Sequence, residues 1–189
     1  MISVLYSLEI STYYCHNDTV EINKILSKYL ENSANGRYLG WEGNRNDSLW
    51  INPTDYIEKI KSFGNEFRLV QSNNCYFTLS YSLDSINVFK DHAFGYVTLN
   101  AVANGYVIDL LKIDPHEVNK RYLLVKKDNR WYLLSETKDW FVSVKSYVKW
   151  ANNALKNRSW ENEEKYKINT INNLHNMNSL LTDSLNSKF

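Results

Sequence analysis

The sequence has few of the residues that form metal centres, disulfide frameworks or phosphate-binding loops. Only two cysteines occur, and Cys15 and Cys75 lie too far apart in the chain for a zinc motif, so buried free thiols are expected. The four histidines show no HxH or HExxH spacing. A GxSxG motif and a glycine-rich phosphate loop are also missing. The sequence therefore predicts no metal site and no cofactor.

The chain also lacks an apolar run long enough to cross a membrane. Its first residues, MISVLYSLEIS, are apolar but have no preceding basic residue, contain Glu9 and lack a small-residue cleavage site. They are therefore not predicted to be a signal peptide. A cytoplasmic protein without a membrane partner is expected, unless a leader has been removed.

An excess of either charge is missing as well. The 22 basic and 21 acidic residues leave a net charge of +1, so electrostatics give no general argument for nucleic acid as a partner. What the chain does contain is 43% hydrophobic and 14% aromatic residues, enough for a packed core. Its 189 residues are sufficient for one domain of ordinary size with an added helix.

The first third of the chain reads as helices. The spacing of apolar residues over 2–15 is compatible with a short helix, which is the prediction, but also with a strand. Asp18-Thr19 is expected to cap a second helix that ends near Asn35-Gly36. A third helix is predicted from Asn52-Pro53 to Phe63-Gly64. The second helix has its apolar residues at helical spacing: Val20, Ile22, Ile25, Leu26, Tyr29 and Leu30.

From about residue 66 the pattern changes to a period of two, which is typical of strands. Alternation runs over 67–83 and again over 94–103, and 106–113 is a further candidate strand that would end at Asp114-Pro115. Residues 119–136 read as a strong hairpin that reverses at Asp128-Asn129, residues that tolerate positive φ. Because the connections are short, the five or six strands should be antiparallel neighbours.

After the hairpin, residues 137–142 are expected to leave the sheet. A helix should follow, with an apolar face formed by Val144, Tyr147, Val148, Ala151, Ala154 and Leu155. A last helix, from about Trp160 to Leu185, has an amphipathic stripe of Ile171, Leu174, Met177, Leu181 and Leu185. This stripe either packs on the domain or forms a homodimer or partner contact. The predicted fold class is α+β, with N-terminal helices packed on a strongly curved, cone-like antiparallel sheet and additional C-terminal helices.

Two stretches carry a resemblance to a known family. VFKDHAFGYVTLNAV at 88–102 and RYLLVKKDNRWYLLS at 121–135 resemble the strands of the nuclear transport factor 2-like fold, in which charged residues and then Trp follow an apolar run. The resemblance covers residues 1–142 and leaves 143–189 as a C-terminal helical extension packed on the same domain. It implies a conical pocket, which in this fold serves isomerases and dehydratases, ligand binders, secretion-channel subunits and bacterial immunity proteins.

Within such a cone, two sets of residues are candidates for chemistry or ligand binding. Enzymes of this fold often use an Asp-His pair as general base and orienter, which makes Asp91-His92 the weak catalytic alternative to a turn of exposed polar residues. Neighbours on a strand point to opposite faces, which argues against catalysis. The second set lines the expected pocket, unless these residues are simply core: Tyr81, Tyr96 and Trp131.

The loop after the second helix contains aromatic residues where a protein partner could contact them. Tyr and Trp are enriched at interfaces because they combine a large apolar area with a polar tip. The predicted partner-binding residues are Tyr38, Trp41, Glu42 and Trp50, although a loop with two tryptophans could also fold back on the core. The chain is predicted to be a non-enzymatic protein-binding module, and its resemblance to the immunity proteins of this fold implies that it binds and neutralises a cognate bacterial toxin. The alternatives are a small-ligand binder or cone-pocket enzyme, and a subunit of a secretion or conjugation apparatus.

Overall fold

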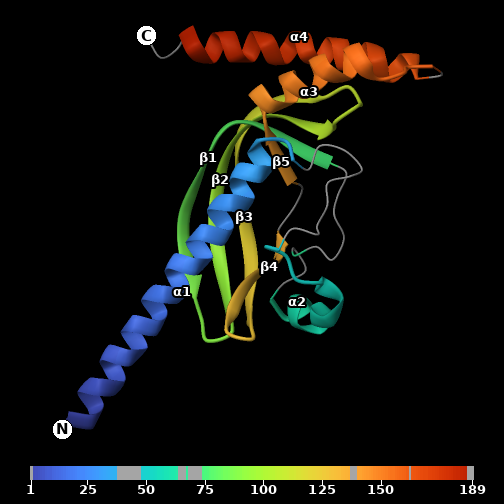
Figure 1. The fold of residues 1–189 in the computed structure, drawn as a ribbon. Helices are drawn as coiled ribbons and strands as arrows, with labels where there is room; N and C mark the ends of the chain where they lie inside the picture. The colour runs from blue at the N-terminus through green and yellow to red at the C-terminus, as the bar shows by residue number, and fades with distance from the viewer. Residues whose placement is uncertain are drawn as a thin grey trace.

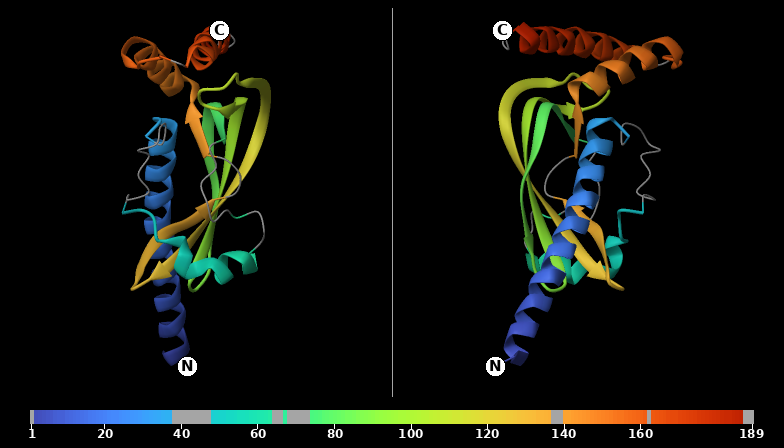
Figure 2. Two further views of the ribbon diagram at one scale, coloured as in Figure 1. Left: turned by 90° about the vertical axis from the view of Figure 1, so that its right-hand side faces the viewer. Right: turned by 60° about the vertical axis from the view of Figure 1, so that its left-hand side comes forward.

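A computed structural model describes residues 2–37, 48–63, 67, 74–136, 140–161 and 163–186, without the side chains of 2–16, 135–136 and 184–186. Four α-helices and a five-stranded sheet make up this part of the chain (Figure 1). Helix α1 lies against the inner face of a curled, half-barrel sheet, and α3 and α4 lie across one end of it (Figure 2). The predicted α+β class, with helices on a strongly curved sheet, is confirmed.

Helix α1 (Ile2–Ala34) is a single helix, not the two that the sequence suggested. Asp18 does not cap it, because the Asp18 carboxylate accepts hydrogen bonds from the hairpin instead. The helix ends as predicted at Gly36, where φ is 74° and the amides of Gly36 and Arg37 bond to carbonyls one turn back. Its second half packs on the sheet, whereas its first half projects past the end of the strands (Figure 1).

The sheet has the order β4-β3-β2-β1-β5. Its three long strands are β1 (Asn74–Val88), β2 (His92–Tyr106) and β3 (Lys112–Lys127), all antiparallel neighbours, as predicted. The pairing of β1 with β2 shifts register three times, between Phe77 and Thr78, Thr78 and Ser80, and Leu83 and Ser85. Such bulges bend the strands and increase their twist, which accounts for the curl.

The hairpin forms as the sequence predicted. Strand β3 runs into β4 (Arg130–Glu136) through Asp128 and Asn129, which have φ values of 50° and 60°. Two consecutive residues with positive φ are the mark of the two-residue turn whose twist matches that of the strands.

The candidate strand over 106–113 with its end at Asp114-Pro115 is wrong, because residues 107–111 form the turn between β2 and β3, and Asp114 and Pro115 lie within β3. Ala101 pairs with His116, and Ala103 pairs with Ile113. Asp114 and Pro115 therefore lie opposite a single residue of β2, Val102, which makes a bulge. A bulge tolerates proline, which has no N–H to donate to the ladder.

Residues 137–142 do not simply leave the sheet. Strand β5 (Trp140–Ser143) pairs in parallel with β1, with Cys75 opposite Trp140. The sheet is therefore mixed. The chain crosses from one edge to the other because the run Trp140, Phe141 and Val142 is fully apolar and is buried there.

The C-terminal helices share the main core. Helix α3 (Val144–Asn157) buries Val144, Tyr147 and Ala151, and Met177 of α4 (Glu164–Asn186) is fully buried. The side chain of Asn173 joins α4 to the turn after β2, because it accepts from the amide of Leu111 and donates to the carbonyl of Asp109. Ile171, by contrast, is 47% exposed, so the predicted stripe is only partly buried.

The outer face of the sheet is covered near the hairpin. A 3-10 turn, η1 (Pro53–Tyr56), leads into α2 (Ile57–Phe63), and both lie within the predicted third helix. Ile60 packs there with Phe67, Leu123, Val125 and Leu134 in a second, smaller core. The curved sheet is thus packed on both faces, by α1 on the inner one and by α2 on part of the outer one.

Candidate functional site

The inner face of the sheet, where the predicted cone would hold a ligand, is occupied by side chains of α1. Leu26 and Tyr29 are buried, and a Cβ on Gly95 of β2 would clash with Cδ1 of Leu26. The Tyr29 ring packs edge-on against Tyr122, with ring centroids 5.3 Å apart, and against Trp50 at 5.5 Å. Over the described residues this face is therefore a packed core.

Of the predicted pocket residues, Trp131 lies on the inner face and is 2% exposed. Its indole N–H donates to Asp18 of α1 at 3.0 Å. The Asp18 carboxylate also accepts a hydrogen bond from Lys126 Nζ at 2.7 Å, and this ammonium lies 5.6 Å from the Trp131 ring centroid. These contacts fasten α1 to the hairpin, which is a structural role.

Tyr81 and Tyr96 lie on opposite faces of the sheet. Tyr81 is paired with Leu99, which belongs to the inner core, and the Tyr81 ring is 5.4 Å from that of Phe141. Partial burial, together with the nearby charge of Glu31, raises the pKa of Tyr81 above its usual value. Tyr96 has the opposite parity on β2, and so points outward. The structure therefore does not bring the predicted pocket residues together.

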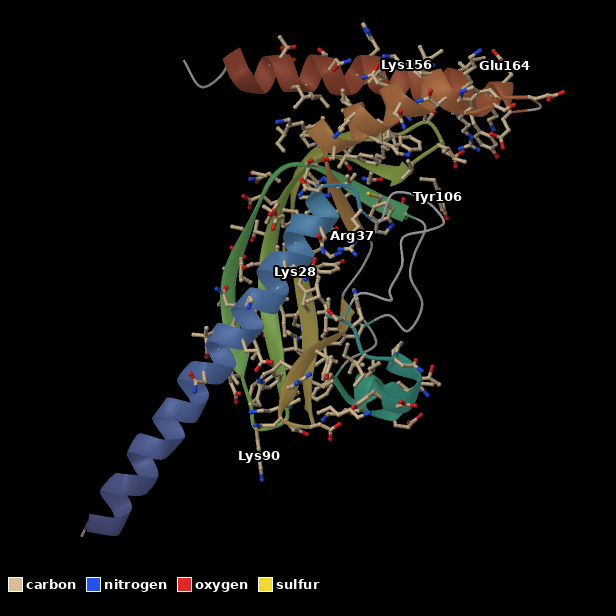
Figure 3. All side chains as sticks on the ribbon, in the orientation of Figure 1. Lys28, Arg37, Lys90, Tyr106, Lys156 and Glu164 are labelled. Carbon is tan, nitrogen blue, oxygen red and sulfur yellow. The ribbon has the colours of Figure 1, made fainter. Side chains whose placement is uncertain are left out.

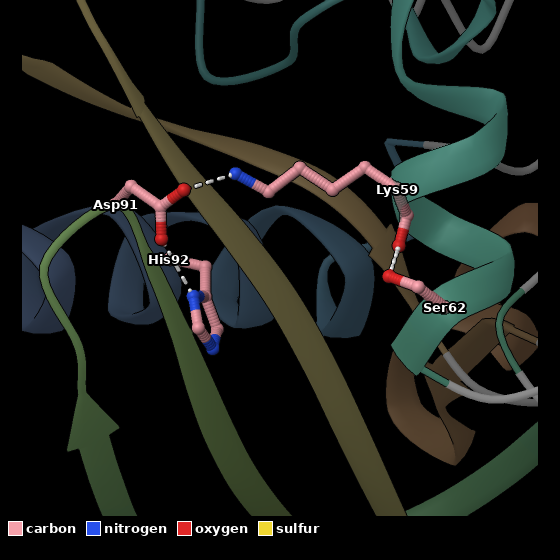
Figure 4. Close-up of polar contacts among 4 residues, drawn as sticks. All are labelled: Lys59, Ser62, Asp91 and His92. Atoms are coloured by element: carbon pink, nitrogen blue, oxygen red, sulfur yellow. Dashed lines mark hydrogen bonds and ion pairs between the residues drawn. The ribbon is translucent and has the colours of Figure 1, made fainter.

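Asp91 and His92 do meet, contrary to the expectation for neighbours on a strand. Asp91 lies in the turn before β2, so its Oδ1 reaches His92 Nδ1 at 2.8 Å, and its Oδ2 receives Lys59 Nζ of α2 at 2.6 Å (Figure 4). Both hydrogen bonds stabilise the carboxylate and lower the pKa of Asp91 to about 2, His92 contributing most.

The position of this pair does not suit catalysis in a cone. The His92 ring is stacked on Phe89 at 4.6 Å and lies 4.5 Å from Phe63 of α2, on the outer face. The Asp91 side chain is 61% exposed. The pair, with Lys59, joins α2 to the β1–β2 turn.

Among the predicted partner-binding residues, Tyr38, Trp41 and Glu42 lie outside the described residues. Trp50 is half-buried and packs against the main core, and the chain around it runs alongside β4. The amide of Ile51 donates to the carbonyl of Leu133 at 3.1 Å, and the amide of Leu133 to the carbonyl of Leu49 at 2.7 Å. Of the two possibilities for this loop, the described part folds back on the core.

A surface cleft of about 450 Å³ lies between the end of α1 and α3. It is lined by two lysines, one tryptophan and several small polar residues: Asn35, Gly36, Ser146, Lys149, Trp150, Asn152, Asn153 and Lys156. We call it the α1–α3 cleft. Lys156 projects from this end of the molecule in Figure 3, and Arg37 lies beside the end of α1.

Hydrogen bonds hold the two walls of the α1–α3 cleft in place. Ser143 caps α3, accepting from the amide of Ser146 at 3.2 Å, and its hydroxyl lies 2.8 Å from the carbonyl of Ala34. Ser33 Oγ donates to the carbonyl of Phe141 in β5. The end of α1 is thus fixed to β5 and to the start of α3, and its position relative to the cleft wall is set.

The sequence contains a signal for this cleft that the interface prediction did not use. Lys145, Lys149 and Lys156 recur at intervals of four and seven, which places them on one face of the predicted helix, and no acidic residue occurs between Val144 and Asn157. The opposite wall of the cleft, at the end of α1, lies more than a hundred residues earlier in the chain, so the lysine pattern could not predict it.

Within the described residues, no group of three or more potential metal ligands occurs, and no helix is both long and apolar enough to cross a membrane. The comparisons with known proteins found no match among protein-family models, curated proteins or solved structures.

Proposed function

We propose that the protein is a non-enzymatic protein-binding module, and specifically a bacterial immunity protein that binds and neutralises a cognate toxin in the cytoplasm. The observation that carries this proposal is the occupied inner face. Where an enzyme of the resembled fold would hold its substrate, Leu26, Tyr29 and Tyr122 are packed together. Binding features lie instead on the surface, in the α1–α3 cleft.

Two further observations support binding over catalysis. The Asp91–His92 pair lies on the outer face, where Lys59 bonds to Asp91 and the Phe89 ring stacks on His92, so its contacts are those of a structural pair. The α1–α3 cleft offers Lys, Asn, Ser and Trp side chains, which suit recognition of polar groups and aromatic packing. Neutralisation by steric occlusion needs only such a surface and a tight fit.

The test is a neutralisation assay. The chain is co-expressed with the product of the neighbouring open reading frame, the complex is isolated by a tag on one partner, and growth of cells that produce the partner alone or with the chain is compared. We expect a stoichiometric complex and restored growth, with protection that saturates at about one chain per partner. Absence of both the complex and the protection would refute the proposal.

A double variant, Asp91→Asn with His92→Gln, is the control for catalysis. Both changes keep the approximate shape of the side chains and remove the acid-base pair. Protection that survives in this variant agrees with occlusion. Protection that is lost while the variant remains folded, or that needs far less than one chain per partner, would indicate an enzyme.

A further inference from the structure

The α1–α3 cleft has a distinct electrostatic character. None of its described lining residues is acidic, and two are lysines. Lys149 and Lys156 have no ion-pair partner in the ranges that the structure describes, and both are exposed. Several other cations of the described surface are paired, including Lys59 with Asp91, Lys112 with Asp114 and Arg158 with Glu163.

The end of α1 does not cancel this charge. The C-terminus of a helix is negative where its last carbonyls lack partners. Here the carbonyls of residues 31–34 all accept hydrogen bonds, from the amides of Asn35, Gly36 and Arg37 and from the Ser143 hydroxyl. Among the lining residues that the structure describes, Lys149 and Lys156 therefore supply the charge, and it is positive.

The remaining lining residues suit a peptide. Asn35, Asn152 and Asn153 line the cleft with side-chain amides, a group that can both donate to and accept from a peptide backbone. Within α3, Asn152 donates to the carbonyl of Val148 and Asn153 accepts from Asn157, and each amide keeps capacity for a further hydrogen bond. Trp150 forms an aromatic wall of the cleft, and its ring packs against that of Tyr147, with the ring centroids 5.7 Å apart. Tryptophan is among the residues that most often anchor a protein interface.

The spacing of the lysines limits what can bind. Lys149 and Lys156 are seven residues apart on one helix, about 10 Å along its axis. In a polyproline II chain, which has three residues per turn and rises about 3.1 Å per residue, carboxylates at positions i and i+3 lie on one face and are about 9 Å apart. Nucleic acid is the less favoured occupant, because its affinity depends on many phosphate contacts and this cleft supplies only a few cations.

We propose that the α1–α3 cleft is the docking site for an acidic segment of the protein partner, with carboxylates about three residues apart that pair with Lys149 and Lys156. This proposal rests on the proposed function, because it names the chemistry of the partner. It predicts that affinity falls as salt is raised, since exposed ion pairs are screened over about 10 Å at 0.1 M salt.

The probe is a synthetic peptide of about ten residues with Glu at every third position, compared with the same peptide carrying Gln. Each is titrated into the isotope-labelled full chain and followed by proton–nitrogen correlation NMR at low salt. We expect the Glu peptide to shift the resonances of Gly36, Lys149 and the Trp150 indole, and the Gln peptide to bind at least about tenfold more weakly. Equal binding of the two peptides would overturn the proposal.

The double variant Lys149→Glu with Lys156→Glu should reduce binding of the Glu peptide by at least about tenfold. Its matched control is the double variant Lys90→Glu with Lys127→Glu, which changes the net charge by the same amount in the exposed turns at the far end of the sheet, where Figure 3 labels Lys90, and which should leave binding unchanged. All these lysines are exposed, and thermal unfolding checks that the variants are folded. An equal loss of binding in the control would show a general charge effect and refute the site.

Other occupants have distinct outcomes, each of which overturns the proposal. Inorganic phosphate that binds as tightly as the Glu peptide would indicate a free-anion site. A single-stranded oligonucleotide that binds more tightly, with a steep salt dependence, would indicate nucleic acid. A dimer that dissociates in the Lys149 and Lys156 double variant would indicate a second copy of the chain.

The two proposals can fail separately. If the double variant still captures the partner and protects cells, the docking site is wrong and the proposed function stands. If the Glu peptide binds as expected and no protein partner or protection is found, the proposed function is wrong while the preference of the cleft for acidic peptides stands.

Discussion

Replacing Asp18 with alanine tests how α1 is held on the sheet. The Asp18 carboxylate accepts Lys126 Nζ at 2.7 and 2.9 Å and the Trp131 indole N–H at 3.0 Å. The Asp18 and Lys126 side chains are only 18% and 19% exposed, so both charges are largely removed from water. The variant leaves an ammonium and an indole N–H without their acceptor at the point where the helix meets the hairpin.

The expected cost follows from these contacts. A hydrogen bond to a charged group contributes about 1.5–3 kcal/mol, and leaving a buried donor unsatisfied costs about 1–3 kcal/mol. Because a fifth of each charged side chain is exposed, water recovers part of this loss. We expect Asp18→Ala to lower the free energy of unfolding by about 2–4 kcal/mol, or roughly 4–16 °C in Tm for a chain of this size.

The assay is urea unfolding followed by far-ultraviolet circular dichroism, with thermal unfolding as a second measure. The control is Glu58→Ala, which breaks the exposed Lys61–Glu58 pair and should cost less than about 0.5 kcal/mol. A double-mutant cycle of Asp18→Ala with Lys126→Met should give a coupling of about 1–2 kcal/mol. If Asp18→Ala were no more destabilising than the control, the carboxylate would not be what anchors α1.

Three further outcomes are expected. Gly95→Ala should destabilise the fold by about 1–3 kcal/mol in urea, because the added methyl group would overlap Leu26. The loss of stability should be smaller in a Leu26→Ala background, and an equal loss in both backgrounds would contradict the close packing. Trp50→Ala should also lower the urea midpoint, because the Trp50 ring packs against a core tyrosine. An unchanged midpoint would indicate that the Trp50 ring is exposed in the loop and not packed on the core. The pKa of Asp91 is about 2, below its usual 3.8, so its contribution to stability is present above about pH 4 and is lost as the pH falls toward 2. A carboxyl NMR titration should show this pKa rising in His92→Gln, and no rise would exclude the hydrogen bond as its cause.

Local chemistry was sufficient to predict several elements. The reversal at Asp128-Asn129 follows from two residues that accept positive φ between two apolar runs, and φ values of 50° and 60° confirm it. The end of α1 at Gly36 follows from the freedom of glycine at a helix terminus. In each case the information lies within a few consecutive residues.

Where a distant segment competes with local preference, the predictions were wrong. Asp18 reads as a helix cap, but the hairpin supplies better donors from more than a hundred residues away, and the helix continues through it. Asp114-Pro115 reads as a break, but a bulge opposite Val102 accommodates it. At Asp91-His92 the predicted turn is present, and only the assumption that the two neighbouring side chains point apart was wrong, because Asp91 lies in the turn and His92 on the strand.

The sequence by itself determined the helical and strand periodicities, the hairpin turn and the class of fold, because these depend on the spacing of apolar residues and on the φ values that single residues allow. Tertiary structure alone decided that α1 fills the inner face, that β5 joins the sheet in parallel, and that the lysines of α3 face the end of α1 across a cleft. These features depend on contacts between segments far apart in the chain, and no local pattern specifies which distant surface a given face will meet.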